Sequence, residues 1–201
     1  MSRKTKEEIV EEFRCASIQD AAMRVIARKG LDDATIQDIA DEAGIAKGTL
    51  YVYFRDREEL LAKTADRAFD SLVAELEPAF DGDAPFAERL GNVVLRQLRF
   101  YDENRALFQA TLAIPQAALH KRRPGSYARY AARLEKLFAD AQARGEIRSD
   151  IDPVTIAAIY RDCMRGMIIR RIEQKQTRTS RETDTETIVS VLVRGIASGE
   201  K

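Results

Sequence analysis

The chain is poor in the residues that build metal sites, disulfide frameworks and many catalytic sites. It contains two cysteines, one histidine and no tryptophan among 201 residues. Cys15 and Cys163 lie far apart and follow no metal-ligand spacing, so we expect neither a zinc site nor a disulfide framework. Sparse, unpaired cysteines fit a reducing cytoplasm. We therefore expect no metal and no cofactor.

Long apolar runs and an excess of one charge are also missing. No run approaches the roughly 20 apolar residues that span a membrane, and the N-terminus MSRKTKEEIVEEF lacks the apolar stretch of a signal peptide. A cytoplasmic protein without membrane attachment is expected. Lysine plus arginine equals aspartate plus glutamate, at 33 each, and this balance by itself counts against a nucleic-acid binder.

What the sequence does contain is helical periodicity throughout. It is 45% hydrophobic and 33% charged, which is typical of a globular helical protein with salt-bridged outer faces. Glycine and proline divide the chain into segments, and strand alternation does not occur. The first helix ends at Gly30. Further helices beyond the first three are expected at about 56–77, 85–102, 104–113, 126–143, 153–174 and 184–198.

The N-terminal segment, residues 1–14, has two interpretations. Ile9 and Phe13 continue the apolar spacing of the first helix, so the segment is either an ordered helix or a loose arm. Its basic residues Arg3, Lys4 and Lys6 could reach a minor groove as the arms of some DNA-binding domains do. The four glutamates that follow favour a solvated terminus instead.

Two short helices joined by a glycine turn are predicted between Thr35 and Arg57. Thr35 is a good N-cap, and Asp38 completes a capping-box-like pair with it. Apolar residues then recur at helical spacing up to Ala43, and Gly44 suits a turn that needs a positive φ. This segment forms the first half of a helix-turn-helix pattern.

The second helix of the pair, from about Ala46, is too polar and aromatic to be only core. Its spacing turns Leu50, Tyr53 and Phe54 inward and leaves an outer face of Lys47, Gly48, Tyr51 and Val52. No acidic residue occurs from Ala43 to Arg55, so positive potential is confined to this surface. The second helix of a helix-turn-helix enters the DNA major groove.

The sequence AGIAKGTLYVYFRDREELL resembles the start of the TetR family of transcriptional regulators, over roughly Ser17 to Leu61. The resemblance implies an all-α fold, with an N-terminal three-helix bundle carrying the helix-turn-helix in 1–62. A larger helical effector-binding and dimerisation domain would occupy 63–201. Ala46 stands where the family often has serine, and Val52 where a polar or aromatic residue is common, so the operator sequence does not carry over.

Eight positions are expected to contact DNA: Thr35, Gln37, Lys47, Gly48, Thr49, Tyr51, Tyr53 and Arg57. Lys47 should reach a base edge or a phosphate, although it could be an ordinary solvated lysine. Tyr53 combines a core ring with a hydroxyl that can reach a phosphate. Arg57 matches a position where the family has a lysine that grips the backbone, near a helix N-terminus.

The later helices are expected to serve dimerisation and ligand binding. In the resembled family the last two helices pair with their copies, and aromatic residues of the middle helices line an effector cavity. The alternative is that both sets only close the core, with the arginines in ion pairs. The corresponding pocket residues here are Phe69, Tyr101, Phe108, Tyr127, Tyr130, Arg161 and Arg165.

The sequence thus predicts a homodimeric repressor released from a palindromic double-stranded DNA operator by a small-molecule effector of unknown identity. The alternatives are a helical adaptor or an activator with the same fold. An enzyme is not expected, because His120 lies in a basic loop without a nucleophile motif and no phosphate-binding or metal motif occurs.

Overall fold

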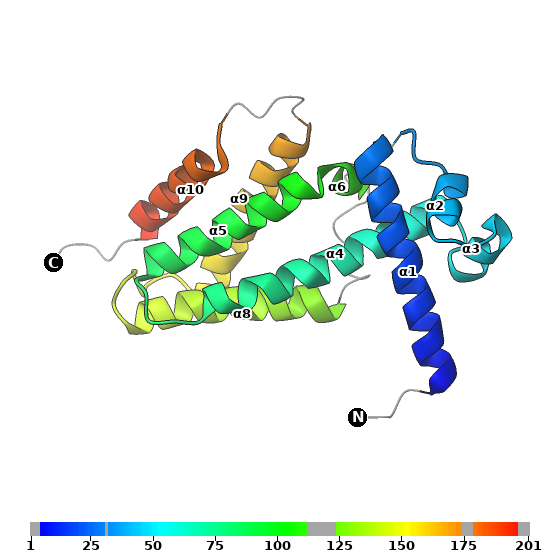
Figure 1. The fold of residues 1–201 in the computed structure, drawn as a ribbon. Helices are drawn as coiled ribbons and strands as arrows, with labels where there is room; N and C mark the ends of the chain where they lie inside the picture. Colours follow the sequence, from blue (N-terminus) through cyan, green and yellow to red (C-terminus); the bar gives the residue numbers. More distant parts are fainter. Residues whose placement is uncertain (1–4, 31, 112–123, 174–178, 197–201) are drawn as a thin grey trace. The chain divides into compact units, whose positions relative to one another are not determined.

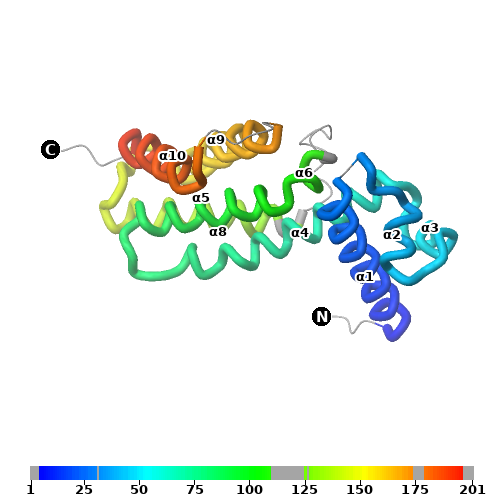
Figure 2. Tube along the Cα trace, turned by 45° about the horizontal axis from the view of Figure 1, so that its top comes forward, coloured from blue at the N-terminus to red at the C-terminus, as the bar shows by residue number. Residues whose placement is uncertain are grey.

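The computed structural model describes residues 5–30, 32–111, 124–173 and 179–196, and these residues form helices joined by turns and loops, with no strand among them (Figures 1 and 2). The helices are α1 (Lys6–Lys29), α2 (Ile36–Glu42), α3 (Lys47–Tyr53), α4 (Arg57–Phe80), α5 (Phe86–Glu103), α6 (Arg105–Thr111), α8 (Pro124–Ala143), α9 (Pro153–Glu173) and α10 (Arg181–Ile196). The predicted all-α class is confirmed. No helix in these ranges combines the length and the apolar character that crossing a membrane requires.

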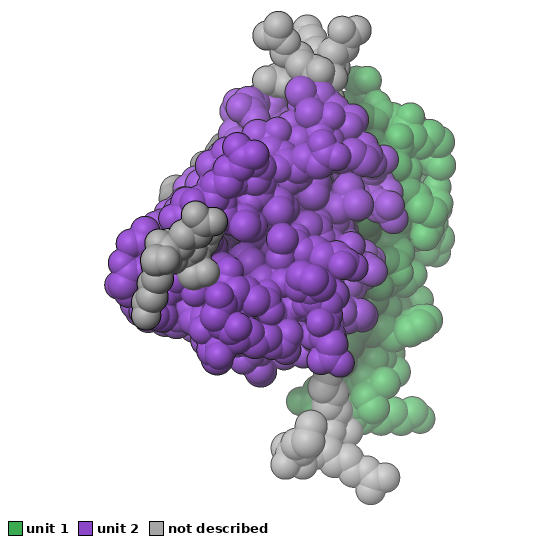
Figure 3. Space-filling model, turned by 90° about the vertical axis from the view of Figure 1, so that its left-hand side faces the viewer, with its two compact units in different colours: residues 1–68, 104–114 green, residues 69–103, 115–201 purple. Residues whose placement is uncertain are grey.

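The chain divides into two compact units, which Figure 3 colours separately. The head unit comprises Met1–Ala68 and Asn104–Ile114, and the body unit comprises Phe69–Glu103 and Pro115–Lys201. Residues of α4 up to Ala68 therefore belong to the head, and the later ones belong to the body. The sequence-based boundary after residue 62 stays a prediction.

The head unit is built on the apolar face of α1. Ala21, Ala22 and Val25 are fully buried there, and α1 packs against both α2 and α6. Thr5 caps α1 in a capping box with Glu8, so the N-terminal segment is an ordered helix from Lys6 onward. Arg3 and Lys4 lie outside the described residues.

The body unit contains α5 packed against α9 and α10, and α8 packed against α9. Its core is aromatic: the ring of Phe138 lies 5.4 Å from that of Phe86 and 6.1 Å from that of Tyr160. Burial of these large side chains supplies most of the driving force for packing the helices together.

A buried ion-pair network joins three helices of the body unit. The guanidinium of Arg171 in α9 donates to both carboxylate oxygens of Asp102 in α5, at 3.1 and 2.7 Å. It also donates to Asp184 in α10. The hydrogen bond that Arg171 donates to Asp102 raises the pKa of Arg171 despite its partial burial. Because Arg171 is only 6% exposed, removing one partner would leave a buried charge uncompensated.

Some predicted helix boundaries were wrong. α4 continues through Pro78 to Phe80, because a proline in the last turn removes only one hydrogen bond. α10 begins at Arg181 instead of 184, since Ser180 accepts a hydrogen bond from the backbone N–H of Thr183 at 3.1 Å and caps the helix. The basic loop that contains His120 lies outside the described residues.

Candidate nucleic-acid interface

The first half of the interface is the capped helix α2. The hydroxyl oxygen of Thr35 accepts from the backbone N–H of Asp38 at 3.1 Å, and the Asp38 carboxylate accepts from the backbone N–H of Thr35 at 3.1 Å. This reciprocal capping box confirms the sequence prediction. A hydrogen bond from Lys29, at 2.6 Å, is the largest cause that lowers the pKa of Asp38 to about 2.

The turn between α2 and α3 follows from one glycine. Gly44 has a φ of 67°, in the left-handed region that a side chain disfavours. The next residue, Ile45, donates its backbone N–H to the carbonyl oxygen of Ala40 at 3.0 Å and closes the end of α2. The turn directs the chain into α3, as the glycine position predicted.

α3 is a short helix with one fixed face and one free face. It spans 7 residues from Lys47 and lacks a side-chain cap at Ala46, as predicted. Leu50 and Phe54 are fully buried and anchor it, whereas the side chain of Val52 is 78% exposed and that of Tyr51 is 45% exposed. The helix therefore presents apolar and aromatic contact groups to solvent, where a partner surface would cover them.

Lys47, Gly48 and Thr49 are also exposed, and they lie in the first turn of α3. The first N–H groups of a helix lack i−4 partners and favour an anion, although here the N–H of Thr49 already donates to the carbonyl oxygen of Ala46 at 2.9 Å. Gly48 has open space around the position of a Cβ atom, so its small size is not required by packing within the chain. A side chain would therefore fit there within this chain, and the predicted close approach to DNA stays a prediction.

The other predicted DNA contacts are occupied by local interactions. The amide of Gln37 donates to Asp41 at 2.8 Å, and the hydroxyl of Thr35 donates to Asp38 at 2.8 Å. Arg57 is half-buried, with Nη2 3.5 Å from the carbonyl oxygen of Ala34. To contact DNA, these side chains would have to give up an intramolecular partner. The side chains on the outer face of α3 are already exposed to solvent.

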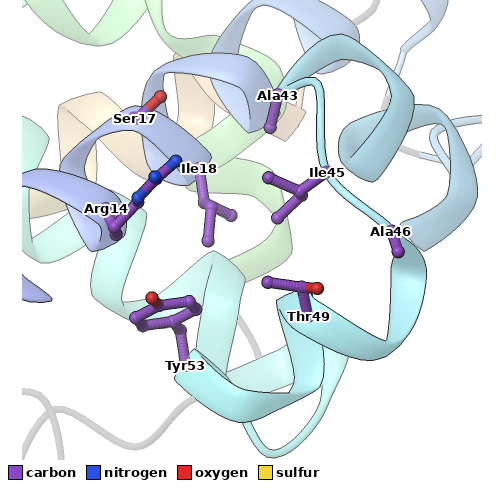
Figure 4. A pocket seen from close by; sticks show the side chains of 8 residues that line it. All are labelled: Arg14, Ser17, Ile18, Ala43, Ile45, Ala46, Thr49 and Tyr53. Atoms are coloured by element: carbon purple, nitrogen blue, oxygen red, sulfur yellow. The ribbon is translucent and has the colours of Figure 1, made fainter.

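A hollow of about 280 Å³ separates α1 from α3 within the head unit (Figure 4). Arg14, Ser17 and Ile18 project from α1 on one side, and Thr49 and Tyr53 project from α3 on the other. The turn supplies the remaining lining residues, Ala43, Ile45 and Ala46. Sequence reasoning missed Arg14 and Ser17, because they come from a helix far upstream and carry no motif.

Most cations of the head unit are neutralised by neighbouring carboxylates. Arg24 and Arg28 bind Glu42 at 2.7 and 3.1 Å, and their hydrogen bonds lower the pKa of that carboxyl group. Other pairs are Lys29–Asp38, Arg55–Asp56, Lys63–Glu59 and Arg67–Asp20. By contrast, neither Arg14 nor Lys47 forms an ion pair with any residue that the structure describes. Positive charge without an ion-pair partner in the described part of the chain thus remains at Lys47, at the start of α3, and at Arg14 in α1. The chain as a whole has no net charge.

The predicted effector residues converge on Tyr130 in the body unit. The ring of Phe69 meets that of Tyr130 edge-on at 5.9 Å, and Tyr101, Tyr127 and Arg161 lie near enough to influence its pKa. Burial raises that pKa well above the ordinary tyrosine value.

Gln97 gives this cluster a polar centre. Its amide nitrogen donates to the Tyr130 hydroxyl, and its amide oxygen accepts from the Tyr160 hydroxyl at 2.8 Å. Because all three side chains are buried, each of these hydrogen bonds has no water to replace it.

Two predicted effector residues have other surroundings, whereas Arg161 remains near Tyr130. Phe108 is buried in the head unit, because the segment around α6 packs with α1. Arg165 is exposed. Arg161 lies over the ring of Tyr127 at 6.0 Å and 3.8 Å from the carboxylate of Glu135. Within the described ranges, no three His, Cys, Asp or Glu side chains could jointly hold a metal ion.

A capped helix, a glycine turn and a second helix with an exposed outer face define a helix-turn-helix protein. Residues 18–64 match the family model described as "Bacterial regulatory proteins, tetR family", so this segment is similar to members of the TetR family. The predicted resemblance to this family is confirmed.

Sequence similarity to curated relatives extends beyond residues 18–64. An uncharacterized HTH-type transcriptional regulator of Haemophilus influenzae is 35% identical over 102 residues, which are 51% of this chain and 52% of that protein. The chain thus spans about half the length of that relative. The fatty acid metabolism regulator protein of Bacillus subtilis is 27% identical over 138 residues, 67% of this chain and 71% of that protein.

A solved structure shares the fold over nearly the whole chain. It is the transcriptional regulator FadR from Bacillus subtilis in complex with stearoyl-CoA, with a TM-score of 0.73 and 21% identity. The alignment covers 90% of this chain and 98% of that one. At this identity the likeness shows the fold alone.

Proposed function

We propose that the protein is a transcriptional regulator that binds a palindromic operator in double-stranded DNA and represses transcription there. The observation that carries the proposal is the construction of α3. Leu50 and Phe54 are fully buried and fix the helix, whereas Lys47, Tyr51 and Val52 remain exposed on its outer face. A rigid helix with a free face is what reading a major groove requires.

The same proposal includes homodimerisation through α9 and α10. A helix of seven residues reaches few base pairs, and two such helices set roughly 34–36 Å apart would read two half-sites. Both C-terminal helices carry apolar residues beyond those that close the core: Ile159 is 49% exposed and Val191 is 66% exposed. Exposed glycines, Gly166 and Gly195, would let a partner helix approach closely.

The effector would bind in the body unit and weaken operator binding. The aromatic residues around Tyr130 would supply apolar surface to such a ligand, and Gln97 lies among them as a polar group. The similarity to a fatty acid regulator and to a structure that holds stearoyl-CoA leads us to propose an acyl thioester of coenzyme A. Binding would alter the spacing of the two heads in the dimer.

The function is tested by the double variant Lys47→Ala with Tyr51→Ala. Operator fragments selected from random duplex DNA should bind the wild type and lose all preference with the variant, as read by fluorescence anisotropy. Helix content by circular dichroism and mass by light scattering should not change, because both side chains are exposed. A control is Lys136→Ala in α8, another exposed lysine. Survival of operator binding in the double variant would exclude α3 as the reading helix.

The effector class is tested by thermal shift with a chain-length series of acyl-CoA esters and with free coenzyme A. We expect a rise in Tm that grows with chain length, and the same esters should release the operator fragment. A helical adaptor with this fold would bind no operator fragment and would show no such release. The absence of a shift with every ester would contradict the effector class but leave DNA binding intact.

A further inference from the structure

We propose that the hollow between α1 and α3 holds one phosphate of the DNA backbone, and that Arg14 is a DNA contact supplied by α1. The inference rests on the proposed DNA-binding function and adds a contact from outside the helix-turn-helix. It also gives Tyr53 its role, as the residue of α3 that shares the phosphate with Arg14.

The lining of the hollow has the chemistry that a phosphodiester needs. Arg14 contributes a guanidinium, and Ser17, Thr49 and Tyr53 contribute hydroxyl donors. The hydroxyl of Tyr53 points toward α1 in Figure 4, while its ring stays half-buried. A guanidinium can donate two parallel hydrogen bonds to phosphate oxygens, and hydroxyl groups are common phosphate contacts in protein–DNA interfaces.

Apolar side chains and a hydrogen-bonded turn form the frame of the hollow. Ile18, which is 2% exposed, and Ile45 form apolar parts of the lining. The backbone of the turn is held by the hydrogen bond from Ile45 to Ala40 at 3.0 Å. A phosphate would therefore meet a hollow whose backbone frame is already formed, which lowers the entropy cost of binding.

Charge favours this place over the rest of α1. Arg14 has no ion-pair partner among the described residues, whereas Arg24 and Arg28 on the same helix are held by Glu42. Toward the N-terminus, Glu11 and Glu12 precede Arg14 and would repel a DNA strand. The attractive part of α1 is thus confined to the turn that faces α3, which is enough for one phosphate.

The length of α3 places its two ends at the two walls of the groove. At about 1.5 Å per residue, Lys47 and Tyr53 are roughly 9 Å apart along the helix axis, and the major groove is about 12 Å wide. Lys47 would meet a phosphate on one wall, and Arg14 with Tyr53 would meet a phosphate on the other. Tyr51 and Val52 lie between these ends, facing the bases.

The test is the salt dependence of binding to duplex DNA of random sequence, because a phosphate contact carries no sequence information. Each lost phosphate contact reduces the slope of log affinity against log salt by about 0.9. Arg14→Gln should reduce the slope by about 1 for each head, hence by about 2 for a dimer. Arg14→Lys should recover part of the slope, since lysine keeps the charge but not the paired donors.

Arg28→Gln is the matched control. It removes the same charge from the same helix, at a site already neutralised by Glu42, so its slope should stay close to that of the wild type. Equal slopes for Arg14→Gln and Arg28→Gln would overturn the proposal, because only a general effect of charge would then remain. Unchanged circular dichroism and Tm verify that both variants fold.

A double-mutant cycle with Tyr53→Phe tests whether both residues share one phosphate. Coupled residues give effects that do not add, whereas separate contacts give additive losses of affinity. Additivity would contradict a shared phosphate.

If wild-type protein prefers no duplex at all, the proposed function fails. If Lys47→Ala with Tyr51→Ala abolishes binding while Arg14→Gln leaves the slope unchanged, only the present inference fails.

Inorganic phosphate is the remaining source of the same chemistry. Titration with phosphate against chloride at equal ionic strength, followed by the NMR signal of the Arg14 side chain, distinguishes the two. Saturable binding of inorganic phosphate together with an unchanged DNA slope in Arg14→Gln would assign the hollow to a free anion and contradict the DNA contact.

Discussion

Arg67 in α4 donates two parallel hydrogen bonds to the carboxylate of Asp20 in α1. Nη1 lies 2.6 Å from Oδ1 and Nη2 lies 3.2 Å from Oδ2, and Nη1 also donates to the carbonyl oxygen of Ala16 at 2.9 Å. The part of α4 that belongs to the head unit is therefore tied to α1, the helix on which that unit is built. Because the two side chains are 42% and 47% exposed, solvent screens much of their attraction.

Asp20→Asn should lower the free energy of unfolding by about 0.5–1 kcal/mol, since the pair is bidentate but solvated. Urea unfolding at low and high salt measures the effect, and high salt should shrink it. The control is Asp70→Asn, an exposed carboxylate on α4, which should change stability little. A loss above about 3 kcal/mol would be that of a buried pair and would contradict the account.

Acid should weaken the head unit through Asp38. Its pKa is lowered from 3.8 to about 2 in the folded state, chiefly by the hydrogen bond from Lys29. A depressed carboxyl pKa contributes stability that is fully present above the unfolded value and is lost as pH falls through the folded value. The difference in unfolding midpoint between wild type and Asp38→Asn should therefore shrink between pH values of about 4 and about 2. A difference independent of pH would contradict this role.

Local chemistry made much of the head unit predictable. Thr35 with Asp38 predicted a capping box, and Gly44 predicted a turn with positive φ. The outward position of Val52 followed from helical spacing alone. Each of these features depends on residues within one or two helical turns, where propensity and spacing decide the structure.

Features that depend on distant contacts could not be read in the same way. Arg14 reaches the hollow from α1, and Phe108 belongs to the head unit because α6 packs with α1. The capping role of Ser180 was local but lay in a weakly patterned segment, so the start of α10 was placed too late. The aromatic residues of the body showed that a core exists, and only the coordinates showed their grouping around Gln97.

Tyr160→Phe should destabilise the body unit by about 1–3 kcal/mol, because the buried amide oxygen of Gln97 loses its donor. Adding Gln97→Leu and Tyr130→Phe should recover part of the loss, since the polar groups are then removed together. Calorimetry of the single and triple variants measures both effects. A triple variant as unstable as the sum of its single substitutions would show that the hydrogen bonds are not coupled.

Ile159→Glu together with Val191→Glu should convert the dimer into a monomer, because both positions are exposed on the proposed dimer helices and a charge buried without a partner opposes association. Analytical ultracentrifugation gives the mass directly. Ile9→Glu on α1 is the control, as an apolar residue of similar exposure (54%) in the head unit, and it should leave the dimer intact. A dimer that persists with both glutamates would place the interface elsewhere.

The placement of α3 in the major groove is tested most directly by a disulfide crosslink. In a background with Cys15→Ser and Cys163→Ser, Val52→Cys would be mixed with selected duplexes that carry a thiol tether on the N4 amine of one cytosine, a major-groove edge. We predict crosslinking at one or two adjacent positions in each half-site. Ala74→Cys, at an exposed position of α4 in the body unit, should give none. Crosslinks absent at every tether position, or equally strong from Ala74→Cys, would contradict the claim that α3 reads DNA.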